Sequence, residues 1–318
     1  MNKPVLAALV AAGVLSACGG GGGGSGGTRP ADPVPVATSS SSDPGPNPQL
    51  APLGQVAAVD HHIDFTQQTA LTPAGLGSFD SLNAMPAPEV SLANTPLIHV
   101  AIPDLNVDDV FDGPVTSTMV NGLRVDTSSK EDATTRRTVT YLAPDAASAN
   151  PFKLQFSSLG VWNTTDIATG QMTNAAAFSV GTRTLGTDIP TNGTATYNGA
   201  MLGVAVEGTS QYSVTGNASA LADFRARSIA VQTSNSMRTD MANGAAGVAT
   251  AAPGYNMTGT LTYPAATNGL SGTMTTADGK TGTATGNFYG PQAAELGMTF
   301  NLKSQTGTTL VGGAALKR

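Results

Sequence analysis

Short apolar–polar alternations separated by turn-forming residues fill the C-terminal half of the chain and constrain its fold more than any other feature. The runs Leu270 to Thr276 and Thr281 to Phe288 flank Asp278-Gly279, and a similar pair of runs flanks Asn198-Gly199. Asn-Gly and Asp-Gly favour two-residue hairpins because both central residues of a type I′ turn need a positive φ. The pattern therefore predicts two antiparallel hairpins, with turns at these two dipeptides.

Further alternating segments in the same region bring the expected number of strands to about eight. They are Ser210 to Thr215, Ile229 with Val231, Leu261 with Tyr263, Met298 to Leu302, and Thr309 to Leu316. Short strands joined by tight turns favour a closed antiparallel barrel, because closure removes exposed sheet edges. Aromatic residues make up 5% of the chain, too few for the aromatic girdles of a transmembrane barrel. We therefore expect an eight-stranded barrel that lies outside the bilayer.

The preceding segment is less regular and predicts a small, loop-rich β domain over residues 51–150. Alternating runs from Leu97 to Ile102 and from Thr138 to Leu142 lie among Pro-rich stretches. The barrel domain is expected over residues 151–318. The predicted fold class is thus mainly β, with a C-terminal eight-stranded antiparallel β-barrel after a small loop-rich β domain.

The first residues resemble an export signal that ends in a lipidation site. The apolar run from Val5 to Leu15 is too short to span a bilayer, and Leu15-Ser16-Ala17-Cys18 is similar to a bacterial lipobox. We expect residues 1–17 to be a lipoprotein signal peptide and Cys18 to carry a covalent lipid that anchors the protein in the outer membrane. An ordinary signal peptide followed by a stray cysteine is the alternative.

Residues 18–50 predict a flexible tether behind the lipid anchor. Beyond Cys18 they are mostly Gly, Ser, Pro and Asp, and such a composition buries too little apolar surface to offset the entropy of ordering. A tether of this kind would hold a folded body clear of the membrane. Cys18 is the only cysteine, so the sequence predicts no disulfide and no catalytic or metal-binding thiol.

Composition and motifs argue against nucleic-acid binding and against catalysis. Charged residues are 11% of the chain and the formal net charge is −6, without a basic run. The Gly-x-Ser-x-Gly match, Gly23 to Gly27, falls in the tether, and no metalloprotease or phosphate-loop motif is present. We expect no catalytic residues, no metal site and no enzyme activity. An enzyme using two facing carboxylates, about 5–10 Å apart, is the alternative.

The acidic segment from Asp104 to Asp112 is a candidate cation site. Asp104-Leu105-Asn106-Val107-Asp108 has the alternating oxygen ligands of a calcium loop. Asp109 replaces the turning glycine and Val115 replaces the bidentate glutamate, which excludes an EF-hand. A solvated acidic loop is the favoured interpretation, and an irregular cation site is the alternative.

The three histidines are the candidate ligands for haem. His61 and His62 are adjacent and His99 lies in an apolar alternation. Imidazole is the usual axial ligand of a haem iron held by a protein. The alternatives are a surface pair for the first two and a half-buried, hydrogen-bonded side chain for His99.

One stretch near the C-terminus carries a family resemblance. Phe288-Tyr289-Gly290-Pro291, followed by Ala293, Glu295, Gly297 and Phe300, resembles the signature of the C-terminal barrel of transferrin-binding-protein-B-like surface lipoproteins. Four further pieces agree in order: Leu159 to Trp162, Phe178 to Gly181, Gly193 to Gly199, and Ala222 to Phe224. The resemblance covers residues 154–318. It implies an eight-stranded barrel on a lipoprotein displayed at the surface of a Gram-negative outer membrane.

The residues of this stretch indicate a barrel corner rather than a ligand site. Phe288 and Tyr289 are adjacent in a strand, so they must point to opposite faces of it. Pro291 favours a first helical turn over the next residues, and Gly297 is suited to end that turn in a left-handed conformation.

The resemblance also implies a binding function. Members of this group capture transferrin, lactoferrin, haem, haemoglobin or a complement regulator, largely through an N-terminal handle domain, for which residues 51–150 are the counterpart. The single lobe of this chain counts against transferrin. We therefore expect iron or haem acquisition with a TonB-dependent receptor and a surface-lipoprotein translocator as possible partners. The alternative is the binding of a host or environmental protein, in adhesion or complement-regulator capture, without metal or haem.

Overall fold

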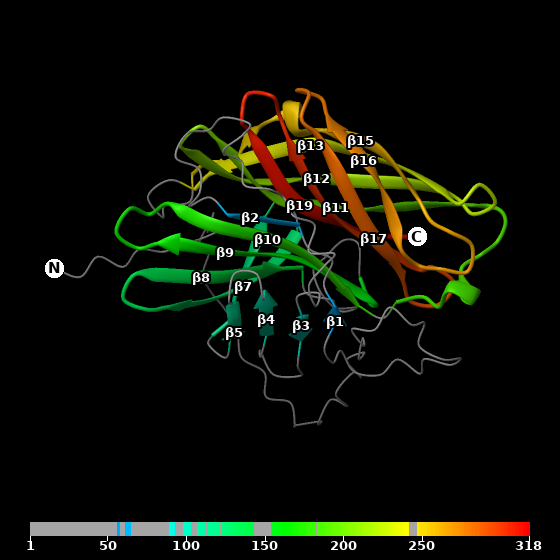
Figure 1. The fold of residues 1–318 in the computed structure, drawn as a ribbon, viewed down its shortest axis with the longest axis horizontal. Coiled ribbons are helices and arrows are strands. Elements are labelled where there is room, and N and C mark those ends of the chain that lie inside the picture. Colours follow the sequence, from blue (N-terminus) through cyan, green and yellow to red (C-terminus); the bar gives the residue numbers. More distant parts are fainter. Residues whose placement is uncertain are drawn as a thin grey trace, which may run out of the picture.

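Three β layers make up the part of the chain that the structure describes (Figure 1). The structure is a computed structural model, and it describes residues 56–57, 61–64, 89–92, 98–102, 107–111, 114–120, 123–142, 154–181, 183–241 and 247–318. The layers are a four-stranded sheet, a six-stranded sheet and a closed barrel. The lipidation site Cys18 and the expected tether lie outside the described residues.

The C-terminal layer is the predicted eight-stranded antiparallel barrel. Its strands are β11 (Thr194–Glu207), β12 (Ser210–Asp223), β13 (Ser228–Asp240), β15 (Met257–Thr262), β16 (Leu270–Thr276), β17 (Thr281–Tyr289), β18 (Glu295–Lys303) and β19 (Thr309–Lys317). Each strand pairs with the next along the chain, and β19 pairs with β11 to close the ring. The short strand β14 (Thr250–Ala251) adds to the end of β13. The predicted fold class is confirmed.

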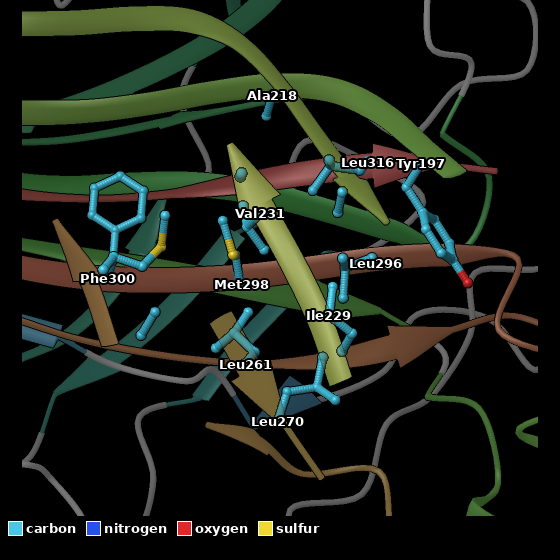
Figure 2. Close-up of a cluster of buried hydrophobic side chains, with 14 of the residues drawn as sticks. Tyr197, Ala218, Ile229, Val231, Leu261, Leu270, Leu296, Met298, Phe300 and Leu316 are labelled. Carbon is cyan, nitrogen blue, oxygen red and sulfur yellow. The ribbon is translucent and has the colours of Figure 1, made fainter. Parts of the chain in front are cut away.

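Alternate residues of each barrel strand fill its interior. In β18, Leu296, Met298 and Phe300 are fully buried and lie on one side of the strand. Figure 2 shows these three side chains in the same buried cluster as Ile229 and Val231 of β13. An apolar–polar alternation of period two produces this arrangement because successive side chains of a strand point to opposite faces.

An aromatic cluster fills the end of the barrel where β17 finishes. The ring of Phe288 lies 5.5 Å from that of Tyr263, edge to face, and 6.1 Å and 6.0 Å from those of Tyr197 and Phe224. These separations suit aromatic pairs. The signature residue Phe288 is therefore the centre of the core at this end.

One of the two predicted hairpin turns is confirmed and the other is wrong. The turn between β16 and β17 contains Asp278-Gly279, so its place is confirmed. Only Gly279, with a φ of 89°, has a positive φ, and the turn is therefore not of the two-residue type I′. Asn198-Gly199 instead lies inside β11, which turns later, at Gly208 and Thr209. Gly199 is needed for close approach: a Cβ there would lie 1.9 Å from the carbonyl oxygen of Ala315 on β19.

The six-stranded sheet has the order β2, β10, β9, β8, β7, β6, and all neighbours are antiparallel. The strands are β2 (His61–Asp64), β6 (Thr116–Val120), β7 (Leu123–Glu131), β8 (Thr135–Tyr141), β9 (Ser157–Asp166) and β10 (Met172–Gly181). Although β9 and β10 follow residue 150, where we placed the domain boundary, they pair in this sheet. The barrel begins only at Thr194, after the 3-10 turn η3 (Gly186–Asp188).

The four-stranded sheet has the order β1, β3, β4, β5. It consists of β1 (Val56–Ala57), β3 (Glu89–Leu92), β4 (Ile98–Ile102) and β5 (Val107–Phe111). The predicted strands around residues 97–102 and 138–142 are confirmed as β4 and β8. No helix in the described part of the chain is long and apolar enough to cross a membrane.

A second apolar layer joins the six-stranded sheet to the outer face of the barrel. Leu159, Val161, Ala175 and Ala177 of β9 and β10 belong to the same buried cluster as Ala200, Leu202, Val204, Val311 and Ala315 of β11 and β19. Figure 1 shows β9 and β10 running beneath the barrel strands. Many of these side chains are small, so the two layers approach closely.

We predict that Gly199→Ala destabilises the protein strongly. The new methyl group would meet the backbone of β19, which cannot move without opening the barrel, so the free energy of unfolding should fall by about 3 kcal/mol or more. Gly269→Ala is the matched control, because no atom lies within 4 Å of its Cβ position, and its effect should stay within about 0.5 kcal/mol. Urea unfolding followed by circular dichroism measures both, and equal effects would contradict the prediction.

Candidate functional site

The signature stretch is a junction between the barrel and the six-stranded sheet. Phe288 points into the barrel, whereas Tyr289 points to the opposite face, as expected. The Tyr289 hydroxyl donates to the carbonyl oxygen of Ser179 on β10, at 3.0 Å, and lies 3.1 Å from the Ser179 hydroxyl. The outward face is therefore buried against the neighbouring sheet.

The carboxylate of Glu295 is the most buried charge-bearing group of the junction. It accepts hydrogen bonds from the backbone N–H of Gln155 (2.6 Å) and Phe156 (3.1 Å) and from the hydroxyl of Ser157 (2.7 Å). Burial raises the pKa of Glu295, and these three hydrogen bonds oppose the rise. All its partners come from the segment that enters β9, so Glu295 attaches that segment to the barrel.

The corner between β17 and β18 is a turn rather than the predicted helical turn. Gly290, Gln292 and Ala293 have φ values of 72°, 52° and 58°, which interrupt a right-handed helix. The Tyr197 hydroxyl donates to the Ala293 carbonyl oxygen at 2.6 Å and holds the turn over the barrel end.

The predicted role of Gly297 is also wrong, because it lies within β18 and not at a helix end. A Cβ at this position would lie 2.2 Å from the Ser179 hydroxyl oxygen. Its lack of a side chain therefore leaves room for β10. The described contacts of the signature residues attach the barrel to the six-stranded sheet and hold the corner between β17 and β18.

The candidate haem ligands lie on two different sheets. The backbones of His61 and His62 pair with Ala177 and Ala176 in the six-stranded sheet. The backbone of His99 pairs with Ser91 and Val110 in the four-stranded sheet. The side chains of these histidines lie outside the described part, so haem binding stays a prediction. The described residues contain no group of three or more His, Cys, Asp or Glu side chains able to hold a metal ion.

The acidic segment is partly a strand, and its central carboxylate is already paired. Val107–Phe111 forms β5, so the expectation of a solvated loop is wrong there. Asp109 is 4% exposed and lies 2.5 Å from Nζ of Lys130 and 3.7 Å from Nε of Arg137. These cations, from β7 and β8, neutralise the carboxylate and join the four-stranded sheet to the six-stranded sheet. The rest of the acidic segment supplies no described side chain for a cation site.

A groove of about 570 Å³ lies on the outer face of the barrel, across β11, β12, β13 and β15. Its lining includes Thr196, Ser219, Leu221, Ala230, Gln232 and Thr258, none of them charged. Leu221 is 51% exposed. The groove offers hydroxyl, amide and apolar contacts to a partner, and its lining residues include no imidazole or thiolate for a haem iron. The sequence did not predict this groove, because alternation along a strand shows which residues point outward but not which outward residues of different strands lie together.

Comparison with known proteins agrees with the barrel geometry. Residues 189–317 match the family model described as the C-lobe and N-lobe β-barrels of Tf-binding protein B. These residues include all eight strands of the barrel. No curated protein matches the chain. The chain is therefore a protein with a transferrin-binding-protein-B-like barrel domain, as the sequence resemblance indicated.

Three solved structures of transferrin-binding protein B are similar to the chain. A double mutant from Haemophilus parasuis Hp5 is 15% identical, with a TM-score of 0.47 and coverage of 82% of this chain and 44% of that one. The isotype 1 protein from serogroup B Neisseria meningitidis is 16% identical, with a TM-score of 0.41 and coverage of 82% and 44%. A mutant from Actinobacillus pleuropneumoniae H49 is 12% identical, with a TM-score of 0.38 and coverage of 82% and 100%. The chain spans less than half the length of the first two.

We predict that Glu295→Gln lowers the free energy of unfolding by about 1–3 kcal/mol, because an amide NH₂ would face one of the three donors. Since burial raises the pKa of Glu295 above its ordinary value of 4.5, its contribution to stability is complete below that value. It is lost as the pH rises through the folded-state pKa. The difference between wild type and variant should therefore shrink from acidic to neutral pH.

Urea unfolding measured at several pH values tests this prediction. Asp188→Asn is the control, since Asp188 is exposed and its replacement should change stability by no more than about 0.5 kcal/mol. A difference between Glu295→Gln and wild type that grows with rising pH would contradict the assignment.

Proposed function

We propose that the protein is a surface-exposed outer-membrane lipoprotein that captures a partner for iron or haem acquisition and hands it to a transporter. The observation that carries the proposal is the match of residues 189–317 to the barrels of transferrin-binding protein B, a protein described by the partner it binds. The chain contains a single such barrel in its described part. We therefore take from this match only the class of function, the binding of a partner, and do not propose that the partner is transferrin.

The expected membrane attachment supports this proposal. A lipid on Cys18, followed by the low-complexity residues 18–50, would tether the folded layers to the outer membrane. Capture away from the membrane then requires hand-over to a membrane transporter, for which a TonB-dependent receptor is the proposed acceptor. A surface-lipoprotein translocator is the proposed export partner.

Haem is the first candidate ligand, with His61, His62 or His99 as the axial ligand. Capture of a protein without haem is the second candidate, and the uncharged groove on the barrel favours it. That groove offers a surface for a protein partner and no ligand for iron among its lining residues. The two candidates use different parts of the molecule, so variants can separate them.

We predict that haem added to the protein from Gly19 onward produces a Soret band and that replacing the ligating histidine by alanine removes it. Absorbance titrations of His61→Ala, His62→Ala, His99→Ala and the triple variant measure the effect. Leu221→Glu is the control, because it alters the groove and leaves the histidines unchanged. Absence of a haem-dependent band would reject haem as the ligand. If Leu221→Glu instead stops the protein from binding a protein partner, the second candidate, capture of a protein without haem, would be favoured.

We predict that Cys18→Ala abolishes attachment to the outer membrane, because the thiol that accepts the lipid is lost. Metabolic labelling with palmitate and membrane fractionation measure lipid incorporation and location. Ser16→Ala is the control, since it keeps a small residue before the cysteine. Equal labelling of wild type and Cys18→Ala would contradict the proposed anchor.

A further inference from the structure

A small recess lies at the barrel end that carries the aromatic cluster. It has a volume of about 70 Å³ and lies where η3, the β12–β13 turn and the loop after β15 meet. Its lining includes Ile189, Pro190, Phe224, Arg227, Tyr263 and Ala265. The lining residues are apolar or glycine except for Thr191, Arg227 and Tyr263.

The Tyr263 hydroxyl is a buried donor without a partner. The residue is 6% exposed, and the hydroxyl oxygen has no hydrogen-bond partner in the structure. The Tyr263 ring packs edge-on against Phe288 on the core side, while the residue also lines the recess. Burial raises the pKa of Tyr263, so the hydroxyl keeps its proton and can donate. A buried polar group left unpaired is destabilising and points to a ligand that would satisfy it.

Arg227 lies beside Tyr263, and its positive charge opposes the rise that burial causes in the pKa of Tyr263. Its backbone carbonyl accepts the Tyr263 N–H at 3.3 Å, which places the two residues opposite each other at the end of the β13–β15 ladder. Arg227 has a φ of 53°, and Ala266, at the other side of the recess, has a φ of 56°. Such left-handed positions are unfavourable for residues other than glycine and cluster at binding sites.

The neighbouring acid does not occupy the recess. Asp223 accepts the backbone N–H of Ala226 at 2.9 Å, within the β12–β13 turn. Asp223 is absent from the residues that line the recess. Besides burial, the charge of Asp223 also raises the pKa of Tyr263, so this carboxylate lies near the hydroxyl. Among the lining residues, however, Arg227 is the charged one, and together with the Tyr263 donor it favours an anion.

We propose that this recess binds a carboxylate group. The Tyr263 hydroxyl would donate to one carboxylate oxygen and the Arg227 guanidinium to the carboxylate as a charge-assisted donor. Phe224, Ile189 and Pro190 would contact the adjoining carbon atoms. The volume exceeds the roughly 10–15 Å³ that one water molecule needs and suits a group of the size of acetate or propionate.

The apolar lining favours the binding of a carboxylate over that of other anions. A phosphate dianion is strongly hydrated over its whole surface and would lose water against Phe224 and Ile189 without replacement. A carboxylate on a short carbon chain exposes its charge on one side and carbon on the other. The source of the carboxylate is either a small free acid or an acidic side chain or C-terminus of a peptide. This inference does not depend on iron or haem and goes beyond the proposed function.

The test is a titration of the full protein with propionate, followed by ¹H–¹⁵N NMR. The amide signals of Arg227, Tyr263 and Ala266 should shift with a dissociation constant in the millimolar range, and the neutral analogue propionamide should leave them unchanged. Tyr263→Phe and Arg227→Gln should each weaken binding about tenfold, as loss of a hydrogen bond to a charged group does. Arg225→Gln is the matched control, because Arg225 lies in the same turn and does not line the recess.

Thermal unfolding separates a binding role for Tyr263 from a structural one. Tyr263→Phe removes an unpaired hydroxyl and keeps the ring against Phe288, so Tm without ligand should stay the same or rise. The rise of Tm that propionate causes in the wild type should disappear. A lowered Tm with an unchanged response to propionate would overturn the proposal.

A peptide ending in Phe with a free carboxylate, compared with its C-terminal amide, identifies the source. Binding tenfold tighter than propionate would assign the recess to a peptide partner, and equal binding would assign it to a small acid. The proposal is overturned if propionate shifts no signal, if propionamide acts equally, or if inorganic phosphate binds more tightly than propionate.

Discussion

The buried carboxylate of Glu295 is the interaction on which the layered arrangement depends. Two backbone N–H groups and one hydroxyl from the segment entering β9 satisfy it, and without them a buried carboxylate would be strongly destabilising. The same attachment of the six-stranded sheet to the barrel brings β10 over Tyr289 and Gly297. At the far end of that sheet, the Gln211 side chain bonds both backbone groups of Met172, at 2.8 Å and 3.0 Å. The six-stranded sheet is thus attached to the barrel at both ends.

Polar and charged side chains lie at both ends of the barrel. At the end with the β11–β12 turn, Glu207 accepts from Arg238 and Tyr255, at 3.1 Å and 2.5 Å. Lys280 pairs with Asp278 and lies over the Tyr255 ring. At the opposite end the Tyr263 hydroxyl is left without a partner.

Patterns in the sequence predicted local structure well where neighbouring strands alone decide it. Asp278-Gly279 forms a turn because its two strands are adjacent in the chain and short. Asn198-Gly199 has a similar composition and lies within a strand, because β19, more than a hundred residues away, packs against Gly199. The same applies to β9 and β10: we expected residues 151–318 to form the barrel domain, but the partners β8 and β2 decided that β9 and β10 join the six-stranded sheet. A local sequence pattern does not show which distant strand a segment will pair with.

The sequence by itself determined the mainly β class, the eight-stranded barrel and the inward and outward faces of Phe288 and Tyr289, because these follow from alternation and turn residues. It also pointed to the signature that the family match bears out. Only the tertiary structure decided that Glu295 joins two layers, that Asp109 is neutralised by Lys130 and Arg137, and that Tyr263 and Arg227 share a recess. Each of these depends on groups brought together by strand pairing and packing, and those distances are set by the whole fold.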